Sequence, residues 1–248
     1  MASDMSWLMT IALVGCGHIG IDPRLTDIED DGGLADVLPD AVPGAPGWVL
    51  VQTEAVQGPT LTVDPLGSQH LIVMAVQLDQ DGLVTAITDN SNCNSYMSIS
   101  TAHAGCAELE TELVMYYANP SCTGATTISV AATTSVLAAV VWEVSGIRTD
   151  DPLDTAIVLD DQPASTSPLG PTITTSTDGE FVVSVAIVDN IASGIHPGNE
   201  FTNDQFAFGN GWAHLTDPMA KAGVHQAQWD QPDPGVYCAN AAAFKIVP

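Results

Sequence analysis

From Trp48 onward, the sequence is a series of short runs rich in Val, Ile, Thr and Ala, separated by Gly, Asn, Asp and Pro. No stretch keeps apolar residues at the i, i+3, i+4, i+7 spacing of a helix for long. Runs of this size, bounded by turn residues, predict β-strands. The expected strands are residues 48–55, 60–63, 70–78, 83–88, 95–101, 109–118, 126–132, 136–145, 172–177, 180–188, 205–215, 222–229 and 235–246.

Two kinds of strand are expected. Three runs are apolar on both faces, which predicts central strands covered on both sides; they are LIVMAV, VLAAVVW and FVVSVAIV. Residues 109–117 alternate instead, with Glu110 and Glu112 on the face opposite the apolar one. A helix over residues 102–113 is the weaker alternative, because it would spread apolar groups around its whole circumference.

So many short strands predict an all-β domain over residues 48–248, a two-sheet antiparallel β-sandwich of jelly-roll type. A β-propeller would require a repeat of about 40 residues, and no such repeat is evident. Asp178-Gly179 is the best signal for a tight hairpin, joining residues 172–177 to 180–188.

The charge balance excludes one class of function. The chain has 30 Asp plus Glu against 4 Lys plus Arg, a formal net charge of −26. Nucleic-acid binding requires clustered Lys and Arg, so nucleic acid is not an expected partner. A strongly acidic surface keeps a protein soluble and attracts cations; adaptation to concentrated salt is a second interpretation.

The N-terminus carries an apolar run of nine residues, WLMTIALVG, at positions 7–15. A membrane-spanning helix needs about 20 apolar residues, so this run fits the core of a signal peptide instead. It ends in Leu13-Val14-Gly15-Cys16, which resembles the lipobox of bacterial lipoproteins.

The resemblance implies that residues 1–15 are cleaved off and that a lipid is attached to Cys16. Gly17 occupies the position that the family reads as a sorting signal, and it implies an outer-membrane or extracellular-surface location. One departure from the family pattern is that the segment before the apolar run has Asp4 and no Lys or Arg.

Residues 16–47 combine acids and prolines without a sustained hydrophobic period. Such a composition cannot bury enough apolar surface to fold. We expect a lipidated acidic tether that holds the domain away from the membrane.

A second resemblance concerns the body of the chain. Three segments are similar to a poorly characterised secreted bacterial β-sandwich domain with a TDS-GN-Y turn, a YYA-N strand end and a W-E-YSG strand end; they are TDNSNCNSY at 88–96, YYA at 116–118 and WEVSG at 142–146. The resemblance implies the fold and no particular activity.

Four cysteines remain after Cys16: Cys93, Cys106, Cys122 and Cys238. An even number in an exported chain predicts two disulfides. A hairpin of residues 95–101 with 109–118 would favour Cys93–Cys122 with Cys106–Cys238. The pairing of sequence neighbours, Cys93–Cys106 with Cys122–Cys238, remains open.

Candidate ligand sites are few. Oxygen-bearing side chains in two turns could bind a structural calcium ion, the one cofactor considered; they are Asp79, Asp81, Asp89, Asn90 and Asn92. Asx turns, in which Asp and Asn bond their own backbone, are the alternative interpretation. Trp212 and Trp229 could stack on sugar rings, although core packing is the usual fate of such residues.

No catalytic motif is recognised. Glu108, Glu110 and Glu112 lack surrounding aromatic residues and fit the solvated charges of a strand edge. His214 and His225 flank a turn, where isolated histidines are the simplest interpretation. We therefore expect a non-catalytic cell-surface lipoprotein with a structural, adhesive or binding role, whose partners are a membrane through the lipid and a glycan or another surface protein. A carbohydrate-binding module and an unrecognised hydrolase are the alternatives.

Overall fold

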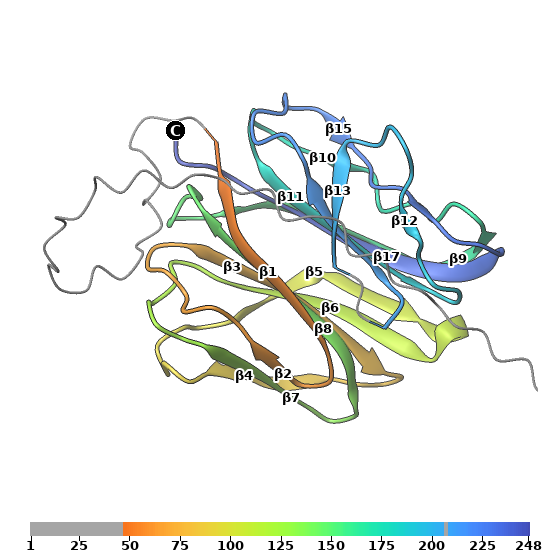
Figure 1. Ribbon diagram of the computed structural model, residues 1–248, viewed down its shortest axis with the longest axis horizontal. Helices are drawn as coiled ribbons and strands as arrows, with labels where there is room; N and C mark the ends of the chain where they lie inside the picture. Colours follow the sequence, from red (N-terminus) through yellow and green to blue (C-terminus); the bar gives the residue numbers. More distant parts are fainter. Residues whose placement is uncertain (1–46, 206–207) are drawn as a thin grey trace, which may run out of the picture. The chain divides into compact units, whose positions relative to one another are not determined.

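The computed structural model describes residues 47–205 and 208–248, and its strands fall into two series of similar length (Figure 1). The first series is β1 (Val49–Gln57), β2 (Thr60–Thr62), β3 (Leu71–Asp79), β4 (Val84–Asp89), β5 (Met97–Cys106), the 3-10 turn η1 (Ala107–Leu109), β6 (Thr111–Ala118), β7 (Thr127–Ala132) and β8 (Val136–Ser145). The second is β9 (Leu153–Ser165), β10 (Ile173–Thr174), β11 (Phe181–Val188), β12 (Gly194–Ile195), β13 (Phe201–Gln205), β14 (Gly211–Leu215), β15 (Val224–His225), β16 (Trp229–Asp230) and β17 (Gly235–Phe244).

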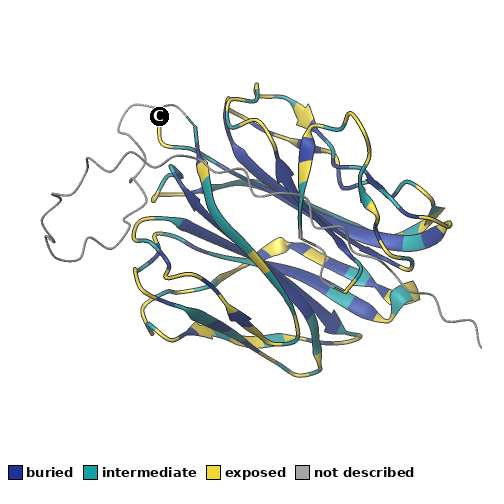
Figure 2. Cartoon of the chain, in the orientation of Figure 1, coloured by how far each residue is buried: buried dark blue, intermediate teal, exposed yellow. Residues whose placement is uncertain are grey.

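The prediction of an all-β, antiparallel sandwich is confirmed. Two five-stranded sheets, in the orders β1-β8-β3-β6-β5 and β13-β14-β11-β17-β9, supply the two main layers. The predicted hairpin of residues 95–101 with 109–118 is present as β5 and β6. The three runs that are apolar on both faces form β3, β8 and β11, which lie inside their sheets and are buried along nearly all of their length (Figure 2).

The two series have the same topology. Read from the other edge, the second sheet is β9-β17-β11-β14-β13, and each strand takes the place of β1, β8, β3, β6 and β5 in turn. The outer layers also correspond: β2 and β4 pair with β7, while β10 pairs with β15 and β12 with β16. Residues 49–145, the N-terminal half, and residues 153–244, the C-terminal half, therefore repeat one connectivity.

Equivalent segments meet where the two halves end. Ile147, just after β8, forms an antiparallel bridge with Ile246, just after β17. The N–H of Arg148 donates to the carbonyl of Lys245 at 3.0 Å, and the N–H of Val247 donates to the carbonyl of Gly146 at 2.9 Å. This reciprocal pairing is the pattern expected at a local twofold axis.

The strands form four layers, which are the two five-stranded sheets and one outer layer of smaller sheets on each side of them. A hydrophobic core lies between each pair of neighbouring layers. The central core lies between the two five-stranded sheets and contains Trp142 and Phe181. Ile72 and Met74 of β3 point to the opposite face and pack under the β2-β7-β4 sheet. The corresponding outer face of the second sheet packs against Trp229 and its neighbours. Covering both faces of each sheet explains why the central strands are apolar throughout.

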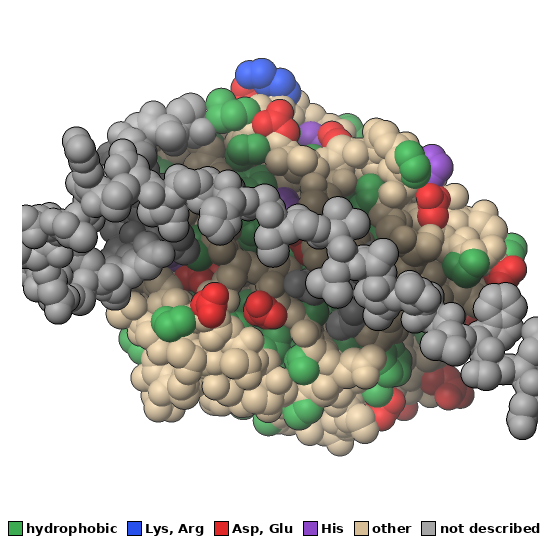
Figure 3. Space-filling model, in the orientation of Figure 1, with side chains coloured by type: hydrophobic (Ala, Val, Ile, Leu, Met, Phe, Trp, Pro, Cys, Tyr) green, Lys and Arg blue, Asp and Glu red, His purple; other side chains and the backbone are tan. Residues whose placement is uncertain are grey.

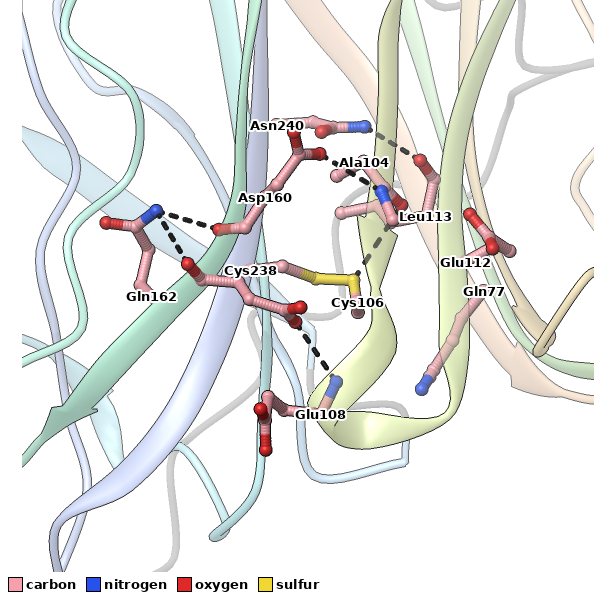
Figure 4. Close-up of a disulfide and its surroundings, with 12 residues drawn as sticks. Gln77, Ala104, Cys106, Glu108, Glu112, Leu113, Asp160, Gln162, Cys238 and Asn240 are labelled. Carbon is pink, nitrogen blue, oxygen red and sulfur yellow. Dashed lines mark hydrogen bonds between the residues drawn. A yellow bond between two sulfur atoms is a disulfide. The ribbon is translucent and has the colours of Figure 1, made fainter.

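A disulfide and polar groups join the two halves. Cys106 at the end of β5 is bonded to Cys238 of β17, with a Cα–Cα distance of 5.7 Å (Figure 4). Nearby, the buried amide of Asn240 donates to the carbonyls of Ala102 at 2.7 Å and Leu113 at 3.1 Å. Asp160 of β9 accepts the backbone N–H of Gly105 at 3.2 Å. These bonds cross from the second sheet to the edge of the first.

Several predictions of local structure were wrong. Residues 205–215 were expected as one strand, but β13 ends at Gln205 and β14 begins at Gly211. Residues 222–229 were also expected as one strand, but they hold the short strand β15 and the start of β16, with a connection between them.

The strand β9 was not expected, because its acids and Pro163 interrupt the apolar pattern; the proline is tolerated since β9 lies at a sheet edge. Asp178-Gly179 forms a turn, with Gly179 at φ 76°, but its flanking strands are not hairpin partners. β10 pairs with β15 in the outer layer, whereas β11 pairs with β14 and β17.

Candidate functional site

A cavity lies at the open end of the β13–β14 hairpin. Phe201 and Leu215 are the last paired residues at this end of the hairpin. The chain before β13 and the chain after β14 form the two walls of the cavity. The cavity has a volume of about 560 Å³, within the range typical of small-molecule sites. We call it the His225 pocket; it is lined by Asn199, Glu200, Leu215, Thr216, Asp217, Ala220, Lys221 and His225.

His225 is the buried polar group of this pocket. It lies on β15, opposite Ile173 of β10, and both ring nitrogens have contacts. Nδ1 is 3.1 Å from a carboxylate oxygen of Glu200, and Nε2 is 3.3 Å from the hydroxyl oxygen of Thr175. A neutral ring that donates from Nδ1 to Glu200 and accepts at Nε2 satisfies both contacts.

The order hydroxyl, imidazole, carboxylate is that of a nucleophile, its base and an orienting group. The position of Thr175 argues against that role here. Its side chain is buried and does not line the cavity, and its hydroxyl oxygen accepts the N–H of Gly223 at 3.1 Å. The arrangement therefore orients His225 from behind instead of presenting a nucleophile to the pocket.

Much of the lining is satisfied within the protein. Asn199 donates to the carbonyl of Gln226 at 3.0 Å and accepts the N–H of Phe201 at 3.0 Å. The hydroxyls of Thr216 and Thr202 are 2.7 Å apart.

Glu200, Asp217 and Lys221 present exposed charged groups at the cavity, and each also has one partner within the protein. The Lys221 ammonium bonds Asp178 at 2.7 Å, which lowers the pKa of Asp178 and raises that of Lys221. Acceptors outnumber donors in this set, so the pocket suits a small polar ligand that donates several hydrogen bonds.

The corresponding place in the N-terminal half is occupied by a disulfide. The β5–β6 hairpin is closed by Met97 and Tyr117, and Cys93 before it is bonded to Cys122 after it, with a Cα–Cα distance of 6.0 Å. Together with the bond between Cys106 and Cys238, this is the pairing that the hairpin geometry favours.

The structure does not bring the predicted calcium residues together. Asp79 ends β3 and Asp81 lies in the turn before β4, whereas Asp89 is the last residue of β4 and Asn90 and Asn92 follow it. The two groups are therefore at opposite ends of one strand. In the described ranges, no three His, Cys, Asp or Glu side chains lie close enough to bind a metal ion.

Asp89 organises its loop instead. One carboxylate oxygen accepts the hydroxyl and N–H of Ser91 and the N–H of Asn92, and the other accepts the Asn94 amide at 2.8 Å and the Tyr96 hydroxyl at 3.1 Å. Burial alone would raise the pKa of Asp89, but these hydrogen bonds outweigh it and lower the pKa. This is the Asx-turn arrangement considered as the alternative.

Asn90 ties the same loop to β7. Its side-chain oxygen accepts the N–H groups of Thr126 at 2.8 Å and Thr127 at 3.2 Å. The side chain of Asn94 extends the connection, because its oxygen accepts the N–H of Cys122 at 2.6 Å. The side chains of Asn90 and Asn94, which flank Cys93 in the loop after β4, thus bind the chain at Cys122 and around the start of β7.

The predicted sugar-stacking role of Trp212 and Trp229 is wrong. Both side chains are fully buried. Trp212 lies in the central core between the sheets, and Trp229 lies in the outer core of the C-terminal half. The alternative interpretation, core packing, applies to both.

Two buried acid–histidine pairs were not predicted. Glu143 of β8 accepts His70 Nδ1 at 2.7 Å, the N–H of Gly67 at 2.6 Å and the amide of Gln52 at 2.6 Å. Burial raises its pKa, but these bonds outweigh burial and the net shift is downward. The available signal was a lone acid within the apolar run that ends VVWEVS.

The second pair lies where the two sheets meet. Asp204 of β13 is 2.6 Å from His214 Nδ1 and accepts the indole N–H of Trp142 at 2.7 Å. The Trp142 side chain comes from β8 of the other sheet, so Asp204 links the halves. Neither acid–histidine pair lines the His225 pocket.

The predicted lipidation residue, Cys16, lies outside the described residues, as do the predicted signal peptide and nearly all of the predicted tether. Within the described residues, no helix has the length and hydrophobicity to cross a membrane. Comparisons with protein family models, curated proteins and solved structures found no match to this chain.

Proposed function

We propose that this chain is a non-catalytic display and binding module of a bacterial cell envelope, attached to a membrane by lipid on Cys16. The observation that carries the proposal is that all four cysteines of the described part form disulfides. Disulfides persist in oxidising compartments outside the cytoplasm. Together with the lipobox-like residues Leu13 to Cys16, this supports export.

The anchor is tested in cells that produce the full chain. The wild type should incorporate labelled palmitate and fractionate with membranes, whereas Cys16→Ser should lose the label and appear in the soluble fraction. Ser6→Ala, a change before the apolar run, is the matched control and should behave like wild type. Membrane fractionation that is unaffected by Cys16→Ser would refute the lipid anchor.

The binding role rests on the His225 pocket. Its two exposed carboxylates and one ammonium favour a ligand with several donors, and glycans with their many hydroxyls belong to this class. On a glycan array, the wild-type domain should retain ligands that Glu200→Gln loses. Glu54→Gln, which changes an exposed carboxylate on β1 outside the pocket, should leave binding unchanged.

A further inference from the structure

Chain segments that are distant in sequence gather where residue 47 enters the domain. Gly47 packs against Pro218 and Met219, and a Cβ atom at Gly146 would lie 2.7 Å from the carbonyl oxygen of Gly47. A Cβ atom at Gly179 would lie 3.0 Å from the carbonyl oxygen of Pro218. We call this region the tether pole; it comprises residues 47–49, 146–151, 177–179, 217–224 and 245–248.

The basic residues of the described part all lie at this pole. Arg148, Lys221 and Lys245 are the Lys and Arg residues after position 47. Each is paired with a carboxylate: Arg148 with Asp150 at 2.9 Å, Lys221 with Asp178 at 2.7 Å and Lys245 with Asp151 at 2.8 Å. With Asp217, which has no cation partner among the described residues, the pole holds four Asp side chains against three cations.

The remainder of the described surface has acids without Lys or Arg. Figure 3 shows Lys and Arg side-chain atoms only at the upper edge of the visible face, whereas Asp and Glu recur across it. Bringing a carboxylate without a nearby cation against a lipid layer is costly, and at the pole three carboxylates have such a cation.

Exposed apolar side chains accompany the cations. Met219, Val224 and Val247 are exposed by 46%, 66% and 54%. The N–H of Val247 bonds Gly146, and Ala222, two residues before Val224, bonds Asp178. Apolar groups beside Lys and Arg are typical of surfaces that insert shallowly into a headgroup layer.

We infer that the tether pole is a docking surface for a zwitterionic lipid headgroup layer. The inference rests on the proposed lipid anchor for its biological setting. Some 30 residues separate Cys16 from Gly47, and the tether expected from their composition would have a root-mean-square span of about 30 Å as a flexible chain. A domain held this close meets the membrane repeatedly, and the pole is the end to which the tether is joined.

The test couples the full chain to vesicles directly, so that it does not depend on lipidation in cells. Cys16 is the one cysteine outside the two disulfides, and its thiol reacts with a maleimide-bearing lipid in phosphatidylcholine vesicles. Hydrogen–deuterium exchange of residues 217–224 is then compared with that of the same chain capped by N-ethylmaleimide. Exchange at the pole should slow by about threefold or more, the value expected when it is covered two-thirds of the time.

Matched variants localise the effect. Met219→Asp with Val224→Asp should abolish the protection, because the added charges must be desolvated on docking. Leu83→Asp, at an exposed position in the turn before β4, should leave it intact. Adding phosphatidylglycerol at low salt should weaken the protection through repulsion by the acidic domain.

Three outcomes would overturn the inference. Equal exchange in the vesicle-coupled and capped chains would show that the domain stands clear of the membrane. Protection of the capped chain that grows with protein concentration would assign the pole to a second copy. Protection that increases with phosphatidylglycerol would contradict the zwitterionic partner. Cell fractionation of Cys16→Ser tests the anchor separately, so failure of one proposal is distinguishable from failure of the other.

Discussion

The two halves of this protein share a connectivity but differ at one equivalent place, the open end of the β5–β6 hairpin and of the β13–β14 hairpin. In the N-terminal half this place is closed by the disulfide Cys93–Cys122 and by the loop around Asp89. In the C-terminal half it is the His225 pocket. The repeated architecture therefore does not require an open site, and the pocket is a specific property of the second half.

The largest expected effect concerns the bond that joins the halves. Replacing Cys106 and Cys238 together by Ala should lower the free energy of unfolding by about 4–5 kcal/mol, because the sequence separation closed is 132 residues. Replacing Cys93 and Cys122, whose separation is 29 residues, together by Ala should lower the free energy of unfolding by about 1 kcal/mol less than replacing the first pair does. Urea unfolding measures both. An equal or reversed order would show that loop closure does not govern the difference.

The next effect distinguishes the closed hairpin end from the open one. Asp89→Ala removes the acceptor of bonds from Ser91, Asn94 and Tyr96. It should cost about 3 kcal/mol because several partly buried donors lose the same acceptor. Asp217→Ala at the pocket removes one bond, from the N–H of Met219, and should cost less than about 0.5 kcal/mol. Thermal and urea unfolding of both variants check this. Similar losses would mean that the two hairpin ends are equally constrained.

A pH dependence should arise from the N-terminal half. The lowered pKa of Glu143 means that the folded chain releases this proton at a lower pH than the unfolded chain does. Its bonds therefore stabilise the fold above the ordinary carboxyl pKa, and the stabilisation is lost as the pH falls through the lowered value. Glu143→Gln should lower the free energy of unfolding by about 2 kcal/mol at neutral pH. Below about pH 5, the urea midpoint of this variant should depend less on pH than that of the wild type. An unchanged slope would contradict the assignment.

The smallest effect is expected in the pocket itself. Glu200→Gln removes a half-exposed charge near His225. It should change the free energy of unfolding by less than about 0.5 kcal/mol, because the amide oxygen of Gln can still accept the hydrogen bond from His225 Nδ1. A loss of ligand binding by this variant is then attributable to the pocket. A large loss of stability would instead make the Glu200–His225 contact structural.

The sequence predicted the fold class from local patterns, and it favoured the observed disulfide pairing while leaving the pairing of sequence neighbours open. Runs that are apolar on both faces identified β3, β8 and β11, and the β5–β6 hairpin placed Cys93 near Cys122. The repeated topology was not predicted, because equivalent strands share apolar character without sharing residues. β3 reads LIVMAVQLD where β11 reads FVVSVAIV.

The site was predicted less well than the fold. The pocket depends on which loops meet across the β13–β14 hairpin, and the contact between Glu200 and His225 spans 25 residues. Trp212 and Trp229 were ambiguous because an aromatic residue has the same appearance in sequence whether it is a binding platform or core. Asp89 was ambiguous for a related reason, since a carboxylate that could bind calcium also serves as the acceptor of its own loop.

The central claim is that the open hairpin end of the C-terminal half is a ligand site and the closed end of the N-terminal half is not. The most direct measurement is a nuclear magnetic resonance titration of the isotope-labelled domain with the glycans retained on the array. The account predicts chemical-shift changes centred on Glu200, Asp217 and His225, with Asp89 and Cys93 unaffected. Changes centred on the Cys93–Cys122 loop, or none at either hairpin end, would contradict it.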